Sequence, residues 1–238
     1  MSTRSCLFIV ILTVLLGACK TSRTHFKGAS NAITSSKPPI TYLALGDSYT
    51  IGEMVEQQAT FPFILANSIT KKSSFEVISP TVIAKTGWRT DELILAIQVV
   101  QEKYDLVSVL IGVNNQYQGK EIEQFRAEFK VVLEKAIGFS KSGKRGVFVY
   151  SIPDYSVMPY MRGKDTDQVC AELKNYNAIC SGVAKQMGIS FYDITPISQK
   201  AQHDSKLVAD DKLHPSGAMY KIWVSETVEQ VISNQLSQ

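Results

Sequence analysis

The sequence predicts an α/β fold in which helices cover both faces of a parallel sheet. From residue 40 onward, short apolar runs alternate with longer amphipathic stretches. The runs are nearly continuous and rich in β-branched and aromatic residues, as expected of strands that are buried on both faces. Such an alternation of strands and helices is typical of a parallel sheet. We find no internal repeat and no second domain boundary, so residues 40–238 are expected to form one domain.

Each predicted element follows from a local pattern. Nearly continuous apolar runs predict five strands, at Ile40–Leu45, Phe75–Ala84, Tyr104–Gly112, Gly146–Ile152 and Ile189–Ile194. Apolar residues at helical spacing predict five helices, at Ala59–Lys72, Asp91–Val100, Ile122–Ala136, Asp167–Met187 and Pro215–Leu236. Pro62 and Pro215 are each expected in the first turn of a helix, where proline is tolerated.

Composition excludes several classes of protein. The chain has 238 residues, of which 45% are apolar and 20% are charged, so it is too hydrophobic to be intrinsically disordered. A net charge of +3 with both signs mixed is not typical of a nucleic-acid-binding protein. No group of His, Cys and Asp has metal-ligand spacing, and no glycine-rich phosphate loop occurs. We therefore expect neither a metal nor a cofactor.

Three polar groups follow the first three predicted strands. Ligands of open α/β sheets bind beyond the carboxyl ends of the strands. Gly46-Asp47-Ser48 follows the first strand, Gly87 lies in the turn after the second, and Asn114 follows the third. A hydroxyl, a glycine backbone and a carboxamide are the parts of a nucleophile and an oxyanion hole.

A serine nucleophile needs a proton acceptor, usually a histidine oriented by a carboxylate. The chain has three histidines, of which His25 lies near the N-terminus and His203 has no acidic residue closely preceding it. His214 has Asp211 three residues earlier, so a single loop can bring the carboxylate to the imidazole ring. The sequence therefore favours His214 as the base.

These residues give the chain a resemblance to the GDSL, or SGNH, hydrolase superfamily. The matching blocks are Gly46–Glu53, the turn at Gly87, Gly112–Asn115 and Asp211–Pro215, in the order and spacing of that family. The resemblance spans about residues 40–235. It implies a three-layer α/β/α, flavodoxin-like fold with about five parallel strands. It also implies hydrolysis of carboxylic esters through an acyl-enzyme.

The resemblance also implies the role of each residue. Ser48 would be the nucleophile, His214 the general base and acid, and Asp211 the group that orients His214. The amides of Ser48 and Gly87 and the side chain of Asn114 would form the oxyanion hole. Two positions depart from the family pattern. Tyr49 stands where the family name has leucine, and Asn115 where the family usually has aspartate. The pattern G-x-S-x-G of the larger α/β-hydrolases is absent, because Thr50 stands at its second glycine.

Several functional alternatives stay open. The expected substrate is a small acyl ester, such as a lysophospholipid, a short-chain ester, a thioester or an acetylated polysaccharide. The rival hypotheses are a non-catalytic lipid- or glycan-binding module and a nucleotide or flavin binder, although Asp47 disfavours phosphate at the first loop.

Arg89 is either an anion-binding residue or a solvated surface residue. Residues 154–168 are a candidate lid, and one group of residues is a candidate lining of an acyl pocket: Trp88, Tyr117, Tyr155, Met158, Tyr160 and Met161.

The N-terminus reads as a targeting segment. Arg4 precedes an apolar run that is too short to span a bilayer comfortably, and Leu16-Gly17-Ala18-Cys19 resembles a bacterial lipoprotein cleavage box. We expect residues 1–18 to be a signal peptide and residues 19–39 a tether lipidated at Cys19. An ordinary secretory signal and an uncleaved anchor are the alternatives. The lipoprotein reading predicts attachment to a membrane of the bacterial cell envelope, facing the periplasm, with Lys20 favouring the outer membrane.

Two cysteines remain in the predicted domain. Cys170 and Cys180 lie ten residues apart in one predicted helix, about 15 Å along its axis, which is too far for a disulfide. We expect two unpaired thiols, with Cys180 in the core. A bridge becomes possible only if the helix is broken between them.

Overall fold

The computed structural model describes residues 37–237, which fold around a five-stranded parallel sheet. The strand order is β4-β2-β5-β6-β7. The five strands are β2 (Tyr42–Gly46), β4 (Thr81–Ala84), β5 (Leu106–Leu110), β6 (Val147–Tyr150) and β7 (Ser190–Tyr192). All residues of β2, β5 and β6 are buried, whereas the edge strands β4 and β7 are only partly buried. The prediction of strands buried on both faces is therefore confirmed for β2, β5 and β6 and is wrong for β4 and β7, which lie at the edges of the sheet.

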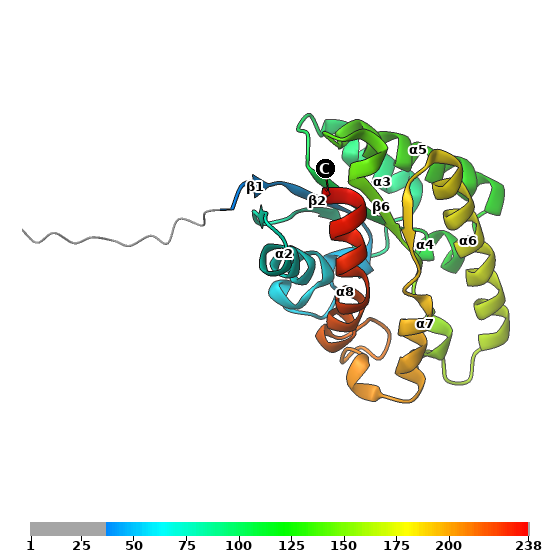
Figure 1. The fold of residues 1–238 in the computed structure, drawn as a ribbon. Helices are drawn as coiled ribbons and strands as arrows, with labels where there is room; N and C mark the ends of the chain where they lie inside the picture. Colours follow the sequence, from blue (N-terminus) through cyan, green and yellow to red (C-terminus); the bar gives the residue numbers. More distant parts are fainter. Residues whose placement is uncertain (1–36, 238) are drawn as a thin grey trace, which may run out of the picture. The chain divides into compact units, whose positions relative to one another are not determined.

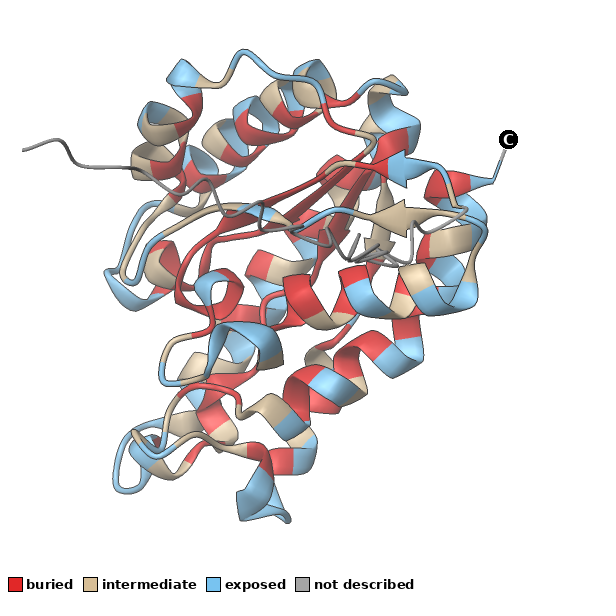
Figure 2. Cartoon of the chain, turned by 90° about the vertical axis from the view of Figure 1, so that its left-hand side faces the viewer, coloured by how far each residue is buried: buried red, intermediate tan, exposed pale blue. Residues whose placement is uncertain are grey.

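Helices cover both faces of the sheet (Figure 1). Helices α2 and α8 pack against each other, and α5 packs against α3 and α6 in the other layer. The longer helices are α2 (Phe61–Lys72), α3 (Thr90–Ala96), α5 (Ile122–Phe139), α6 (Thr166–Met187) and α8 (Gly217–Val231). The short ones are α1 (Ser48–Ile51), α4 (Val113–Tyr117) and α7 (Thr195–Ser198). Figure 2 shows that burial is concentrated in the sheet and in the helix faces that lie against it. The predicted three-layer α/β/α fold is confirmed.

The prediction of one continuous strand at Phe75–Ala84 is wrong. The run Phe75–Ala84 holds two strands, β3 (Glu76–Val77) and β4, and only β4 belongs to the main sheet. Pro80 lies between them, and a proline has no N–H to give to a sheet ladder. Strand β3 pairs instead with β1 (Pro39–Ile40).

The folded region begins before the expected residue 40. Pro39 pairs with Glu76, and the Lys37 ammonium donates to the Ser73 carbonyl at 2.7 Å. The end of the expected tether, residues 37–39, therefore belongs to the fold. Pro38 and Ser237, near the two ends of the described residues, line the same hollow.

Helix α3 ends earlier than predicted, and helix α8 begins later than predicted. The predicted helix Asp91–Val100 is α3 followed by a tighter turn at Ile97–Val99. Helix α8 begins at Gly217, because Ser216 caps it by accepting from the Met219 N–H at 3.4 Å. Pro215 therefore precedes the helix and does not lie in its first turn, whereas Pro62 lies in the first turn of α2 as predicted.

Helix α6 runs unbroken past both cysteines, which are unpaired as predicted. Cys180 is buried in the core, and this burial raises the pKa of its thiol. Because the neutral form is favoured, the thiol behaves as a small apolar core residue.

Candidate active site

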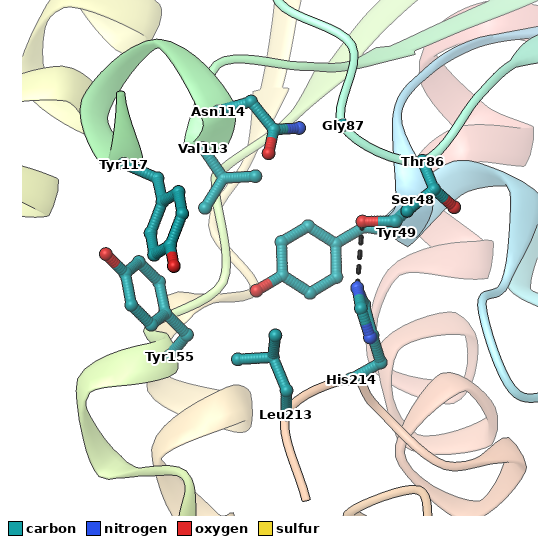
Figure 3. A pocket seen from close by; sticks show the side chains of 10 residues that line it. All are labelled: Ser48, Tyr49, Thr86, Gly87, Val113, Asn114, Tyr117, Tyr155, Leu213 and His214. Carbon is teal, nitrogen blue, oxygen red and sulfur yellow. Dashed lines mark hydrogen bonds between the residues drawn. The ribbon is translucent and has the colours of Figure 1, made fainter. Parts of the chain in front are cut away.

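The carboxyl edge of the sheet gathers the residues that the sequence singled out. Ser48 follows β2, Gly87 lies in the turn after β4, and Asn114 follows β5. His214 enters from the loop before α8. Together these four residues line one cavity of about 190 Å³ (Figure 3).

Ser48 begins helix α1 at a sharp turn after β2. Gly46 makes this turn possible, because a Cβ at that position would lie 2.1 Å from Thr50 Oγ1 and 2.2 Å from the Leu110 carbonyl. Asp47 caps the helix by accepting from the Tyr49 N–H at 3.0 Å. The turn therefore presents the Ser48 hydroxyl at the sheet edge and leaves its N–H without a partner inside the helix.

Ser48, His214 and Asp211 form one chain of hydrogen bonds. Ser48 Oγ lies 2.9 Å from His214 Nε2, and His214 Nδ1 lies 2.5 Å from Asp211 Oδ2. The other carboxylate oxygen of Asp211 accepts from the backbone N–H groups of Leu213 and His214, at 2.9 and 3.0 Å. The carboxylate is therefore fixed by the same turn that carries the imidazole.

The surroundings of Asp211 keep it ionised. Partial burial acts to raise its pKa, but the hydrogen bonds from the His214 side chain and from two backbone N–H groups outweigh burial, and the pKa is lowered. A charged Asp211 accepts the Nδ1–H of His214, which leaves Nε2 free to take a proton from the Ser48 hydroxyl.

The candidate lid, residues 154–168, is hydrogen-bonded to the loop that carries His214. Lys212 adopts a left-handed backbone conformation, with φ of 65°, and its carbonyl accepts from the Tyr160 N–H at 2.9 Å. Tyr160 belongs to the candidate lid, residues 154–168. Tyr155, Met158 and Met161 of that segment are buried, so it packs against the domain and holds the loop of His214.

Gly87 and Asn114 lie on the side of Ser48 away from His214 (Figure 3). One Asn114 amide hydrogen goes to the Trp88 carbonyl at 2.9 Å, and the other has no partner within the described residues. Gly87 has φ of +86°, which favours glycine, and within residues 37–237 its N–H makes no backbone hydrogen bond. Together with the Ser48 N–H, these groups can receive a negatively charged oxygen.

The hydrogen bonds of Asn115 explain why asparagine stands where the family usually has aspartate. The side-chain carbonyl oxygen of Asn115 accepts from the Thr90 N–H at 3.1 Å, and its amide donates to Thr90 Oγ1 at 2.7 Å. The Thr90 hydroxyl then donates to Glu128. An amide can donate to a hydroxyl and an ionised aspartate cannot, so asparagine lets the hydroxyl donate to Glu128.

The Arg89 guanidinium is bound by neighbouring side chains. It donates to both carboxylate oxygens of Asp91, at 3.0 and 2.9 Å, and to Gln118 at 2.7 Å. Glu92 lies 3.3 Å from it as well. Two carboxylates already balance the positive charge, so the structure favours a structural role for Arg89 over anion binding.

The cavity is lined mainly by apolar and aromatic side chains. Of the aromatic residues and methionines considered as a lining, Tyr117 and Tyr155 line it. Met158 and Met161 line a different, more polar hollow, and Trp88 and Tyr160 are not part of the lining. The sequence reasoning missed Tyr49, Thr86, Val113 and Leu213. Each is adjacent in sequence to a predicted site residue, which is the signal that identifies them.

Asp47 is a fully buried carboxyl group beside Ser48. Its Oδ2 forms no hydrogen bond within the part of the chain that the structure describes. Burial raises the pKa to about 7, opposed in part by the N–H groups of Tyr49, Asp47 and Gly112. The group is therefore protonated in the fold at pH values where the unfolded chain is already ionised.

We expect Asp47 to make the folded state less stable as pH rises. The folded pKa of about 7 exceeds the ordinary 3.8, so the contribution of Asp47 to stability is greatest below pH 3.8 and is lost as pH rises from there through 7. Asp47→Asn keeps the oxygen that caps α1 and removes the titration. Thermal unfolding of both proteins between about pH 5 and 8 should show a stability difference that changes by a few kcal/mol, at about 1.4 kcal/mol per pKa unit. Parallel curves would contradict this expectation.

The fold and the site together define a class of protein. The parallel sheet brings a serine hydroxyl, an imidazole and a carboxylate into line at its carboxyl edge, and serine hydrolases use the same three groups in this order. The model of the GDSL-like lipase/acylhydrolase family matches residues 44–222. The chain belongs to this family and is an ester-hydrolysing enzyme, which confirms the resemblance expected from the sequence.

Solved structures share the fold at low sequence identity. Axe2, an acetylxylan esterase from Geobacillus stearothermophilus, superposes with a TM-score of 0.64 at 16% identity, over 83% of this chain and 96% of that one. The lipase/acylhydrolase from Enterococcus faecalis gives 0.64 at 16% identity, over 82% and 96%. TesA gives 0.62 at 16% identity, over 82% and 99%. No curated protein matches the chain.

Proposed function

We propose that this protein is a serine esterase that cleaves carboxylic esters through an acyl-enzyme. The observation that carries the proposal is the unbroken chain from Ser48 Oγ through His214 to Asp211, with distances of 2.9 and 2.5 Å. Hydroxyl and base are already within hydrogen-bonding distance, as nucleophilic catalysis requires.

In the first half of the reaction, Ser48 Oγ attacks the ester carbonyl carbon and His214 Nε2 takes the hydroxyl proton. The carbonyl oxygen becomes an oxyanion, received by the N–H groups of Ser48, Gly87 and Asn114. When the tetrahedral intermediate collapses, the bond to the alcohol oxygen breaks. His214 returns its proton to that oxygen, and the acyl group stays on Ser48.

In the second half, water replaces the alcohol. His214 takes a proton from the water as it attacks the acyl carbon, and the proton then passes to Ser48 Oγ as the bond to serine breaks. The carboxylic acid leaves and the enzyme is restored. Asp211 stabilises the charged imidazole in both halves without itself taking the proton.

The cavity favours a short acyl group. Its volume of about 190 Å³ is below the roughly 300–1,000 Å³ of pockets that hold drug-sized ligands. This supports short-chain esters or acetylated glycans over substrates with long acyl chains. One structural relative is described as an acetylxylan esterase, which is consistent with an acetylated glycan as substrate.

Activity on simple esters tests the proposed function. Purified protein lacking residues 1–19 should hydrolyse p-nitrophenyl acetate and butyrate, and hydrolysis should fall as the acyl chain lengthens beyond the cavity. Absence of hydrolysis with every ester would favour the alternative of a non-catalytic lipid- or glycan-binding module. The presence of all three reactive residues argues against that alternative.

We also propose that the protein is anchored to the bacterial envelope by lipid on Cys19. Cys19 and the signal peptide lie outside the described residues, so the proposal rests on the sequence alone. Within residues 37–237, no helix has the length and apolarity needed to cross a membrane. Cys19→Ser should abolish metabolic labelling of the protein with a fatty acid, which the wild type should show. Labelling that persists in this variant would contradict lipidation of Cys19.

A further inference from the structure

Tyr49 places a phenol hydroxyl inside the substrate cavity. The residue directly follows Ser48, at the position where the family motif has leucine. Its side chain lines the cavity and the residue is only 2% exposed. Figure 3 shows the ring crossing the middle of the lining residues, with the hydroxyl directed away from Ser48 and toward the region of Tyr155 and Leu213.

The protein supplies no partner for this hydroxyl. The backbone N–H of Tyr49 donates to Asp47, and its carbonyl accepts from the Tyr220 hydroxyl at 3.0 Å. Within the described residues, the Tyr49 hydroxyl takes part in no hydrogen bond. Its oxygen is not sealed off, because the fully buried side-chain oxygen without a partner in the described residues is Asp47 Oδ2, so a ligand in the cavity can reach the Tyr49 hydroxyl.

The neighbouring polar groups are already occupied. The Tyr155 hydroxyl donates to Gln116 at 2.8 Å, and the Gln116 amide donates to Glu172 at 2.6 Å. Tyr117 pairs with Tyr160, the Thr86 hydroxyl donates to Glu53, and Ser48 and His214 bond each other. Every other hydroxyl, amide nitrogen and ring nitrogen among the lining side chains therefore has a partner in the described chain, and Tyr49 alone keeps an unused hydroxyl.

The Tyr49 side chain is held in place and stays protonated. Its ring meets the His214 imidazole edge-on, with 5.7 Å between the ring centroids and 62° between the planes. Burial, followed by the nearby Asp47 carboxyl and Tyr220 phenol, raises the pKa of Tyr49 well above its ordinary value. The hydroxyl can therefore both donate and accept a hydrogen bond at neutral pH.

We infer that the Tyr49 hydroxyl binds an oxygen of the substrate a few bonds from the scissile carbonyl. The inference rests on the proposed function and narrows it to esters that carry a hydroxyl, ether or carbonyl oxygen near the ester bond. An unsubstituted hydrocarbon in the same cavity leaves the hydroxyl unpaired. A site that hydrogen-bonds such an oxygen discriminates against the analogue that lacks it. Tyr49 is thus a specificity-determining residue beside the nucleophile.

Matched pairs of esters test this inference and locate the oxygen. Methyl β-hydroxybutyrate and methyl isovalerate differ in the acyl half, where a hydroxyl replaces a methyl group. Ethylene glycol monoacetate and propyl acetate differ in the same way in the alcohol half. For each pair, kcat/KM is measured by acid release in a pH-stat. The quantity of interest is the ratio of the polar ester to its apolar analogue.

We expect Tyr49→Phe to lower this ratio about tenfold in one pair, because one hydrogen bond contributes about 1 kcal/mol or slightly more. A fall in the first pair places the oxygen in the acyl half, and a fall in the second pair places it in the alcohol half. An unchanged ratio in both pairs would overturn the inference. If the wild-type protein hydrolyses none of the four esters or the p-nitrophenyl esters, the proposed function fails instead.

Two control variants separate specificity from structure. Tyr176→Phe removes a hydroxyl that bonds the Lys120 carbonyl, away from the cavity, and should leave both ratios at their wild-type values. Tyr150→Phe removes a buried hydroxyl paired with Thr227 and should lower the melting temperature. Tyr49→Phe should melt no lower than the wild type, because it removes a hydroxyl without a protein partner. A melting temperature as low as that of Tyr150→Phe would show a structural partner and overturn the inference.

Discussion

Ser48→Ala is expected to reduce ester hydrolysis to background, a fall of about 10⁴-fold or more in kcat. Within residues 37–237, the Ser48 hydroxyl is the group that bonds His214 Nε2. Without it, no acyl-enzyme forms and the remaining groups can only assist attack by water. The measurement is kcat on p-nitrophenyl acetate, together with labelling by a fluorophosphonate probe, which should disappear in the variant.

A serine outside the site provides the matched control. Ser225 lies on α8 and its hydroxyl donates to the Ile222 carbonyl on the exposed surface. Ser225→Ala should be labelled by the probe and hydrolyse the ester as the wild type does. Retention of full activity or labelling in Ser48→Ala would show that another residue is the nucleophile, and the proposed mechanism would fail.

Asn114→Ala is expected to lower kcat by about 10²–10³-fold, with a smaller effect on KM. In the proposed mechanism the Asn114 amide donates to the oxyanion, and this hydrogen bond strengthens as charge develops. The loss corresponds to about 3 kcal/mol of transition-state stabilisation. Steady-state kinetics on a short-chain ester measure both constants.

The same substitution also removes a structural hydrogen bond. The Asn114 amide holds the Trp88 carbonyl at 2.9 Å, and losing this bond should cost stability by only about 1 kcal/mol. Thermal unfolding of Asn114→Ala then shows whether the protein is folded under assay conditions. A folded variant with kcat within twofold of wild type would exclude Asn114 from the oxyanion hole.

The central sheet and the grouping of the candidate site residues could be predicted from the sequence, because both depend on local pattern. Strands β2, β5 and β6 are buried on both faces, so their residues are apolar throughout and easily recognised. Asp211 and His214 lie in one short loop, where a spacing of three residues is enough to join them. Parallel topology then places Ser48, Gly87 and Asn114 at one sheet edge.

Other features depend on side chains that meet from distant parts of the chain. From the sequence, Arg89 is a candidate anion-binding residue, but in the structure its guanidinium donates hydrogen bonds to Gln118 and Asp91. Tyr155 was a candidate for the cavity, and the structure adds that Gln116 fixes its hydroxyl. The sequence could not show that the Tyr49 hydroxyl lacks a hydrogen-bond partner in the described chain. That property depends on where each neighbouring polar group directs its own hydrogen bond.

The position of Pro38 and Ser237 bears on how the domain can be engineered. Both residues line one hollow, whereas Ser48 follows the carboxyl end of β2, a strand of five residues that is about 17 Å long. A fusion partner or solid support attached at Pro38 or Ser237 therefore leaves the mouth of the cavity unobstructed. In a chain that starts at Pro38, a short peptide can join this residue to Ser237 across the hollow, and new termini opened in an exposed loop would give a circular permutant with the same site.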